Sequence, residues 1–518
     1  MHSYQYNLGL KFAAVAEQHA DRIALRYPTG HTFTYRQLLM RARQFARLLL
    51  SRGMTAGDVL CIFHNQSFDA FAAMLGAMSV GVIYANVDLS SPDARVLRML
   101  QQVEPRLILA AQPNLTRAGS LAQQVGCRLE CFEDPLLQTE VMAYPSDALI
   151  ETPAITGQHP AYLMFTSGSA GYPKASIATH DNVLNFSNWV RERFLIGPDD
   201  VFTNLNPLAY DNAVFDFFGS LFNGAAMIPF SREIQTQPRE LVDAINELGC
   251  TIWFSVPSLL IYLLRLRALR PGDLRGLGTV AFGGETFPKA PLRQLARHLG
   301  AGIQLINVYG MCETTSIAAA YTLKQRDLVD EKPLPLGHLG ENFQGYVVDE
   351  VRQQVPEGGI GELCISGPGL GLGYYRDPDR TDRAFIRNPW RLNYRETLYR
   401  TGDLVRQDPE TGYYVFLGRK DNQIQHEGHR IELEEIEAAL GALEGISECC
   451  VVYHRDPNGQ GRIAAYVNAK DFDDQVMLTA LRCRLPSYML PHQIISLSPL
   501  PKNVDGKVDR HQLSAMTL

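Results

Sequence analysis

Residues 165–175, FTSGSAGYPKA, combine hydroxyl groups, glycines and one cation in a short stretch. The polar and glycine positions are Thr166, Ser167, Gly168, Ser169, Gly171 and Lys174. Glycine lets the backbone approach a ligand, N–H and O–H groups donate hydrogen bonds, and lysine adds positive charge, so this composition is typical of a phosphate-binding loop. It is not a P-loop, because Pro173 precedes Lys174 and an alanine follows it. The alternative is a flexible turn, which Ser/Gly-rich segments also form.

Four further segments place aromatic or charged residues in turns or after apolar runs. They are 306–316 (INVYGMCETTS), 399–404 (YRTGDL), 418–437 (GRKDNQIQHEGHRIELEEIE) and 500–510 (LPKNVDGKVDR). The first three are expected at the carboxyl ends of strands, where open α/β sheets bind ligands. Taken singly, each has an ordinary alternative: Tyr309 as strand-end packing, Glu313 as a charge at a helix N-terminus, and Asp403 as a turn residue.

Helical and strand patterns alternate around these segments. The stretch FTYRQLLMRARQFARLLLSRG has apolar residues at helical spacing and ends in glycine, whereas VLCIF, RLILAA, TIWFSV, GTVAF and IQLINVYG are typical of short buried strands. This rhythm predicts an α/β fold with mainly parallel sheets flanked by helices. With 518 residues the chain is too long for a single core. The pattern changes near residue 420, so we expect a large N-terminal domain (1–420) and a small α+β C-terminal domain (421–518).

Composition excludes several classes of protein. The chain is 46% apolar and 20% charged with a net charge of −7, which argues against a general nucleic-acid surface. There is no secretory-signal pattern and no apolar run approaching the roughly 18 residues of a membrane span, so we predict a cytoplasmic protein without membrane insertion. Nine scattered cysteines without paired zinc-ligand spacing favour reduced thiols.

Together, the ordered motifs resemble the adenylate-forming superfamily. They look most like the adenylation domains of nonribosomal peptide synthetases (NRPS) and the free-standing amino acid–carrier protein ligases. The resemblance covers nearly the whole chain, although alanines stand at two loop positions where Thr and Gly are common, and Met311-Cys312 replace the usual Pro-Thr. It implies an ATP- and Mg²⁺-dependent enzyme that forms aminoacyl-AMP and diphosphate. It also implies a mobile C-terminal domain that rotates about Asp421.

The resemblance implies a role for each motif in the nucleotide site. ATP would be bound by Thr166, Ser167, Gly168, Ser169, Gly171, Lys174, Gly283, Gly284, Glu285, Asn307, Tyr309, Thr314, Asp403 and Arg419. Tyr309 would stack on adenine, and Asp403 would accept the ribose hydroxyls. Glu313 would hold Mg²⁺, a cation that prefers oxygen ligands. Lys507 would bridge the substrate carboxylate and the α-phosphate. The catalytic residues implied are Lys507, Lys174, Thr166 and Glu313.

The segment 208–225, LAYDNAVFDFFGSLFNGA, places Asp211 where amino-acid-activating members hold the substrate ammonium group. A buried carboxylate needs a cationic partner, whereas the alternative is a helix N-cap. By resemblance, with the register taken from neighbouring motifs, the remaining pocket residues are Asn212, Phe215, Ser255, Val280, Phe282, Val308, Ser316, Ile317 and Lys507. No second charge appears and Phe282 would fill volume, so we expect a small neutral amino acid, glycine first and alanine next, with proline or serine left open.

The acceptor is expected to be separate, because the sequence ends shortly after Lys507. The aminoacyl group would pass in trans to the phosphopantetheine thiol of a discrete carrier protein, in cell-envelope decoration (lipid A or teichoic acid) or in a natural-product pathway. Two rivals are an acyl-CoA ligase, which has no need of Asp211, and a non-catalytic nucleotide-binding relative. His180, His426 and His429 have no pairing typical of catalysis, and we expect them at the surface or behind the site residues.

Overall fold

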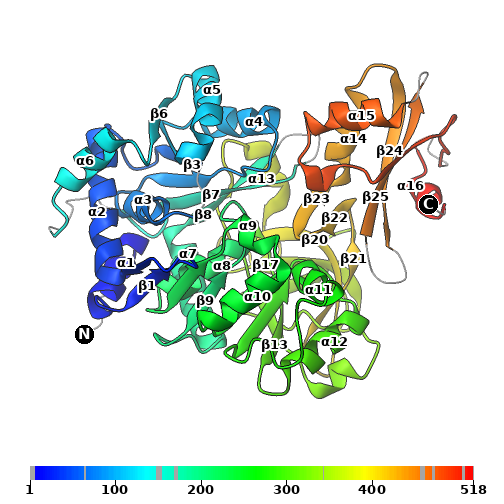
Figure 1. The fold of residues 1–518 in the computed structure, drawn as a ribbon. Helices are drawn as coiled ribbons and strands as arrows, with labels where there is room; N and C mark the ends of the chain where they lie inside the picture. Colours follow the sequence, from blue (N-terminus) through cyan, green and yellow to red (C-terminus); the bar gives the residue numbers. More distant parts are fainter. Residues whose placement is uncertain are drawn as a thin grey trace.

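Figure 1 shows the fold of the chain as a computed structural model. The structure describes residues 6–63, 66–147, 155–168, 173–341, 343–455, 461–469, 473–503 and 508–516. Of the site residues predicted above, Ser169, Gly171 and Lys507 lie outside the described residues. Within the described ranges, no helix combines the length and the apolar character that a membrane crossing needs.

The largest sheet has nine strands in the order β15-β14-β13-β12-β11-β9-β10-β1-β2. These are β1 (Ile23–Arg26), β2 (Thr32–Thr34), β9 (Val201–Asn204), β10 (Ala226–Pro229), β11 (Ile252–Ser255), β12 (Thr279–Gly283), β13 (Gln304–Tyr309), β14 (Ala319–Thr322) and β15 (His338–Leu339). The run from β13 to β1 is parallel throughout. Parallel strands need crossover helices, which explains the alternation seen in the sequence.

A second sheet has seven strands in the order β18-β8-β7-β4-β3-β5-β6. They are β3 (Val59–Phe63), β4 (Ile83–Asn86), β5 (Leu107–Ala110), β6 (Arg128–Cys131), β7 (Pro160–Thr166), β8 (Lys174–Thr179) and β18 (Gly373–Tyr374). Strands β7 and β8 are antiparallel neighbours, with Thr166 opposite Lys174. The predicted phosphate loop therefore joins two adjacent strand ends.

Helices pack on both sheets (Figure 1). They are α1 (Leu8–Gln18), α2 (Tyr35–Ser51), α3 (Phe68–Ser79), α4 (Asp93–Val103), α5 (Leu115–Val125), α6 (Pro135–Ala143), α7 (His180–Arg193), α8 (Asn212–Leu221), α9 (Arg232–Gln235), α10 (Pro238–Glu247), α11 (Pro257–Arg265), α12 (Lys289–Leu299) and α13 (Pro378–Ala384). Helix α2 begins with a capping box between Thr34 and Gln37, which satisfies two backbone donors that a helix start leaves unpaired. Its apolar face, including Leu38 and Phe45, is fully buried in the cluster that joins the two sheets.

A third sheet follows in the chain, with the order β16-β17-β20-β19 and β21 paired to β20. Its strands are β16 (Gln344–Val348), β17 (Ile360–Ser366), β19 (Phe385–Arg387), β20 (Thr397–Gln407) and β21 (Tyr414–Arg419). The β20–β21 pairing sets Asp403 opposite Arg419. This sheet thus brings two predicted ATP residues together.

The residues after 420 form their own small sheets and their own apolar clusters. The elements are β22 (Gln423–His426), β23 (His429–Glu432), α14 (Leu433–Gly441), β24 (Ile446–Arg455), β25 (Gly461–Ala469), α15 (Asp474–Arg482), β26 (Gln493–Ser496) and α16 (Arg510–Ser514). The two apolar clusters of this part contain no residue from the rest of the described chain. The predicted α/β class, with parallel sheets flanked by helices and a small C-terminal α+β part, is confirmed.

Candidate active site

Glu313 is the centre of a buried charge cluster. It lies in a short 3₁₀ helix, η3 (Cys312–Thr314), just after β13, and is 0% exposed. One carboxylate oxygen accepts a hydrogen bond from Tyr374 Oη at 2.7 Å and lies 3.4 Å from Lys174 Nζ, while the other accepts from Arg430 Nη1 at 3.0 Å. Burial alone would raise the pKa of Glu313, but the charges of Arg430 and Lys174 outweigh it and hold the pKa well below its usual range.

The predicted phosphate loop borders this cluster. The hydroxyl of Thr166 is buried and has no hydrogen-bond partner among the residues that the structure describes, and the Ser167 hydroxyl donates to the backbone carbonyl of Arg430. Burial, and after it the charge of Arg430, lowers the pKa of Lys174. The charge of Glu313 acts in the opposite direction and offsets part of this decrease. An unpaired buried hydroxyl beside a buried lysine and a carboxylate suits a phosphate chain with its cation. These residues therefore fit the predicted ATP and Mg²⁺, with Glu313 as the group that would hold the metal.

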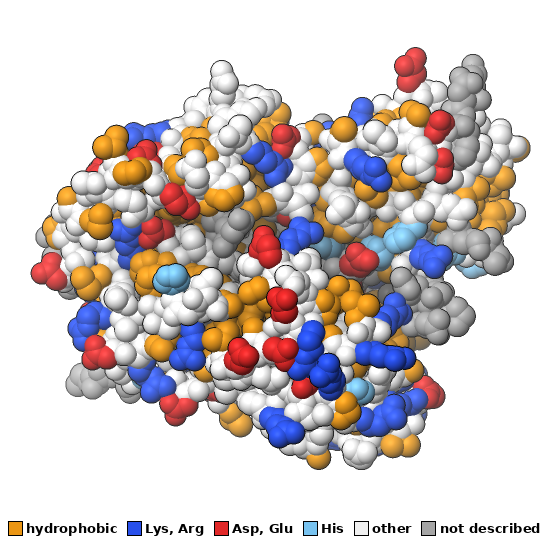
Figure 2. All heavy atoms as spheres, viewed as in Figure 1, with side chains coloured by type: hydrophobic (Ala, Val, Ile, Leu, Met, Phe, Trp, Pro, Cys, Tyr) orange, Lys and Arg blue, Asp and Glu red, His pale blue; other side chains and the backbone are white. Residues whose placement is uncertain are grey.

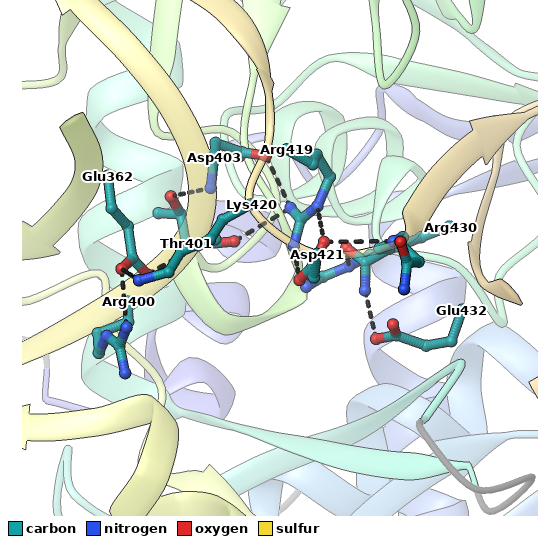
Figure 3. Close-up of polar contacts among 12 residues, drawn as sticks. Glu362, Arg400, Thr401, Asp403, Arg419, Lys420, Asp421, Arg430 and Glu432 are labelled. Atoms are coloured by element: carbon teal, nitrogen blue, oxygen red, sulfur yellow. Dashed lines mark hydrogen bonds and ion pairs between the residues drawn. The ribbon is translucent and has the colours of Figure 1, made fainter. Parts of the chain in front are cut away.

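Asp403 and Arg419 meet at the open end of the same region (Figure 3). Asp403 is 5% exposed, accepts a hydrogen bond from Tyr309 Oη at 2.6 Å and from Arg419 Nη1 at 2.7 Å, and its pKa is raised by burial against the pull of Arg419. Arg419 also binds both carboxylate oxygens of Asp421 at 2.6 Å. Nearby, Arg400 and Lys420 share Glu362, at 2.8 and 3.4 Å.

The turn after β12 makes the opposite wall of the nucleotide region. A Cβ on Gly283 would lie 2.4 Å from the Val308 carbonyl oxygen, so the strands approach too closely there for a side chain. The Glu285 carboxylate accepts from the backbone N–H of Ser258 at 3.1 Å and from that of Gly428 at 2.5 Å. Glu285 thus contacts the β22–β23 hairpin directly.

Two other predicted ATP residues make local contacts. The Asn307 amide donates to the Pro335 carbonyl at 2.8 Å, and Thr314 is fully buried with its hydroxyl against the Met311 backbone. Gly168 is the last residue that the structure describes before the segment 169–172.

Asp211 faces a cavity of about 80 Å³. It stands just before α8, but its side chain makes no capping hydrogen bond, so the N-cap alternative is not supported. Burial raises its pKa to about 6. Among the described residues, no lysine or arginine lies within ion-pair distance of its carboxylate. The cavity shares its walls with the nucleotide region and includes the predicted Asn212, Val308, Ser316 and Ile317.

Four predicted pocket residues do not reach this cavity. Ser255, Val280 and Phe282 lie on the other face of β11 and β12, where Val280 and Phe282 pack among residues of α10–α12. Phe282 is 0% exposed and contacts Phe287 edge to face at 4.9 Å. Successive strand residues face opposite sides, so a shift of one residue moves a whole set of side chains.

Phe254 takes the place expected for Ser255. It lines the cavity, and the predicted Phe215 packs behind it at a ring distance of 5.2 Å, itself 0% exposed. Ala281 joins the same core cluster as Phe254. The expectation that Phe282 fills the pocket is therefore wrong, and with it the size argument for glycine that rested on Phe282.

The sequence reasoning also missed contributors to the site. Tyr374 and Arg430 bind Glu313, and the Cys312 thiol stands beside Asp211, which raises the thiol's pKa after burial itself. The sequence could have pointed to Arg430, because this residue lies in the charged segment 418–437. Nothing in the sequence marked Tyr374.

A second, larger cavity of about 650 Å³ opens between the large domain and the β22–β23 hairpin. On the face shown in Figure 2, histidine side chains lie along the seam where the small C-terminal part meets the rest. The two cavities share the residues Asn86, Asp88, Ala209, Tyr210, Asn212, Gly428, His429 and Tyr488. The cavity beside Asp211 and the wider cavity therefore have one wall in common.

The expectation for the histidines needs one correction. His180 is 0% exposed, and its Nδ1 accepts the backbone N–H of Leu8 at 3.0 Å. It supports the start of α1 and lies far from the surface expected for it. His426 is also buried and contacts the ring of Tyr453.

Comparison with known proteins bears on this geometry. The model of the family "AMP-binding enzyme" matches residues 12–375, and that of the "AMP-binding enzyme C-terminal domain" matches 435–507. The chain is 33% identical over 490 residues to an L-proline--[L-prolyl-carrier protein] ligase of Pseudomonas fluorescens, with 93% of each chain covered. It is 34% identical over 506 residues to surfactin synthase subunit 3 of Bacillus subtilis, of whose length it spans 38%.

A solved structure agrees with the fold. The structure of holo-PA1221, described as an NRPS protein containing adenylation and PCP domains bound to a vinylsulfonamide inhibitor, aligns with a TM-score of 0.81 at 28% identity. The alignment covers 98% of this chain and 84% of that one.

Proposed function

The chain belongs to the family of AMP-binding enzymes, and from this premise we propose that it activates a small neutral amino acid and transfers it to a carrier protein. The first step forms aminoacyl-AMP and diphosphate from ATP. The second moves the aminoacyl group to the phosphopantetheine thiol of a discrete carrier. The observation that carries the proposal is Asp211: a carboxylate without a cationic partner among the described residues faces a small cavity beside the phosphate cluster.

The geometry supports the first step as follows. The substrate carboxylate oxygen attacks the α-phosphorus, and the bond from that phosphorus to the bridging oxygen breaks, releasing diphosphate. Thr166 and Lys174 would bind the departing phosphates, and Asp403 would hold the ribose. Mg²⁺, held by Glu313, supplies charge neutralisation on the phosphates when bound. By resemblance Lys507 would stabilise charge on the reacting carboxylate and α-phosphate; it lies outside the described residues.

Two amino acid classes have separate support. Glycine or alanine is supported by Phe254, whose large ring occupies one wall of the cavity that Asp211 faces. Proline is supported by the name of the Pseudomonas fluorescens relative, which resembles this chain over most of both sequences. An apolar wall of Phe254, Val308 and Ile317 is compatible with either class.

We also propose that the small domain moves about Asp421. The β22–β23 hairpin now contacts the phosphate cluster through Arg430 and the Glu285 turn through Gly428. The small domain must bring Lys507 to the α-phosphate in the first step. In the second step it must leave a path for the thiol of the carrier. A rotation between two arrangements would serve both steps with a single site.

The test is ATP–diphosphate exchange with each of the twenty common amino acids, D-alanine and several simple carboxylic acids. Exchange that depends on glycine, alanine or proline would support the proposal. Exchange only with a simple carboxylic acid would show that the acyl-CoA ligase alternative is right. Exchange with none would favour a non-catalytic nucleotide-binding protein, provided that ATP still binds in calorimetry.

A further inference from the structure

His429 stands at the junction of the two cavities. It begins β23, and its ring lies between two tyrosines: it is parallel to Tyr488 at a centroid distance of 3.5 Å and edge-on to Tyr210 at 4.9 Å. All three side chains line both the amino acid cavity and the wider one. A group entering from the wider cavity therefore passes this imidazole before it reaches the acyl group.

The imidazole has unused hydrogen-bonding capacity. Its Nδ1 is buried, and within the described chain no donor or acceptor pairs with it. A buried polar atom without a partner is unfavourable, and a catalytic role is one reason why native structures retain such an atom. The tyrosine rings fix the orientation of the imidazole by packing, and its Nδ1 is left for a ligand to pair with.

The second step of the proposed reaction needs a proton acceptor. A thiol attacks as the thiolate, and an alkyl thiol with a pKa of about 8.5 is only about 3% ionised at pH 7. Two residues that line both cavities could accept a proton at that pH, Asp88 and His429. Asp88 already accepts hydrogen bonds from the Ser90 and Ser91 hydroxyls at 2.7 and 2.6 Å, which lower its pKa although burial alone would raise it. The tyrosines stay protonated, because burial raises the pKa of both.

We propose that His429 is the catalytic base for thioester formation, an inference that rests on the proposed function. The sulfur of the entering pantetheine attacks the carbonyl carbon of the aminoacyl-AMP. A carbon–sulfur bond forms, the bond between that carbon and the phosphate oxygen breaks, and AMP leaves with the electron pair. The thiol proton passes to a ring nitrogen of His429 and then to solvent.

The charges around the ring keep it ready for this role. Burial lowers the pKa of His429 to about 4, so its lone pair is free at neutral pH. The titratable and charged groups that face it are Asp88, Arg95, Arg232, His426, Tyr210 and Tyr488. Asp88 favours the imidazolium, whereas the two arginines and His426 oppose it. Asp88 is thus the one of these charges that would stabilise the ring while it carries the thiol proton, and the lowered pKa means that the proton is held only briefly before it passes to solvent.

The experiment compares the pH dependence of single-turnover transfer in wild type and His429→Phe. Aminoacyl-AMP is formed on the enzyme, pantetheine is added, and the thioester is measured by mass spectrometry between pH 6.5 and 9. With the base present, the rate should change little with pH. Without it, the rate should follow the thiolate, so the variant should be roughly 10–30-fold slower at pH 7 and approach wild type near pH 9.

Three controls make the result specific. His429→Gln should behave like His429→Phe, because an amide accepts a hydrogen bond but not a proton at this pH. His511→Phe, at an exposed histidine of α16, should match wild type. Trapping by hydroxylamine, which needs no thiol deprotonation, measures the aminoacyl-AMP that each variant forms, and the thioester rate is expressed relative to it.

A wild-type-to-variant ratio that stays constant across pH would overturn the inference and leave His429 as a packing residue. A loss of hydroxamate in the His429 variants alone would also overturn it, because the defect would then precede the thiol. If wild type itself formed no hydroxamate with any amino acid, the proposed function would fail first, and this inference with it.

Discussion

Replacing Asp211 by asparagine should raise stability while removing activity. The pKa of this carboxyl is raised from 3.8 to about 6 by burial, so the folded protein holds the proton more tightly than the unfolded chain. The ionised form then destabilises the ligand-free protein by about 2–3 kcal/mol at pH 7. Asparagine keeps the shape without the charge, and Asp211→Asn should gain that amount in urea unfolding.

The sign of the pH dependence follows from the same shift. Because the raised pKa favours the protonated folded state, wild-type stability should fall as pH rises from about 4 to 7. Asp211→Asn should lack this slope. Asp382→Asn, at an exposed aspartate of α13, is the matched control and should leave both the slope and the free energy of unfolding unchanged.

The loss of activity can be estimated from the ion pair that the substrate ammonium group would form with the Asp211 carboxylate. Removing one partner of a buried ion pair typically costs about 3–5 kcal/mol, so kcat/KM for the amino acid should fall on the order of 10²–10⁴-fold. In wild type the carboxylate is about 90% ionised at pH 7 and about 10% at pH 5, so kcat/KM should drop close to tenfold over that range.

Amino-acid-dependent exchange measures this effect. Activity of Asp211→Asn within threefold of wild type would refute the ammonium role. If Asp211→Asn lost activity but gained no stability, the argument that burial of the ionised carboxylate destabilises the ligand-free protein would be refuted.

Three further predictions follow from the site. Glu313→Gln should lower exchange by at least about 10²-fold and the free energy of unfolding by about 3–5 kcal/mol, because Lys174 would lose its buried carboxylate partner; intact stability in urea would contradict this. Lys507→Ala should abolish adenylate formation while the unfolding transition stays within about 0.5 kcal/mol of wild type, and unchanged exchange would show that the lysine has another role. Phe254→Ala should shift exchange towards larger amino acids, whereas Phe282→Ala should leave the preference alone and lower stability by about 3–5 kcal/mol; the reverse pattern would mean that the strand faces are misassigned.

The sequence predicted those parts of the structure that depend on local pattern. The helical spacing of apolar residues in α2 and the alternation of helices with short apolar strands were sufficient for the α/β class. Tyr309, Asp403 and Arg419 meet as expected, since each follows directly from a motif at a strand end or turn. Ordered motifs thus identified residues that lie together in the structure without any knowledge of the packing, while their role in binding ATP stays a prediction.

The faces of the buried strands could not be predicted. β11 and β12 are buried along their entire lengths, so neither shows a polar residue every second position that would mark the outer face. Placing Phe282 in the pocket was therefore a choice between two equivalent registers. The contacts of His429 were out of reach for another reason: Tyr210 is more than 200 positions earlier, and its approach depends on how the small domain packs.

The shared wall of the two cavities also has a consequence for how the protein folds. Its residues come from four distant stretches, around Asp88, Tyr210, His429 and Tyr488. Contacts between such remote stretches close long loops. The chain entropy lost on closing them makes these contacts form late in folding. The apolar clusters of the last hundred residues, by contrast, are local and can form by themselves. The Gly428 amide donates to the Glu285 carboxylate across this junction, so its protection against hydrogen exchange should appear after that of the strands in either part and would report that the two parts have assembled.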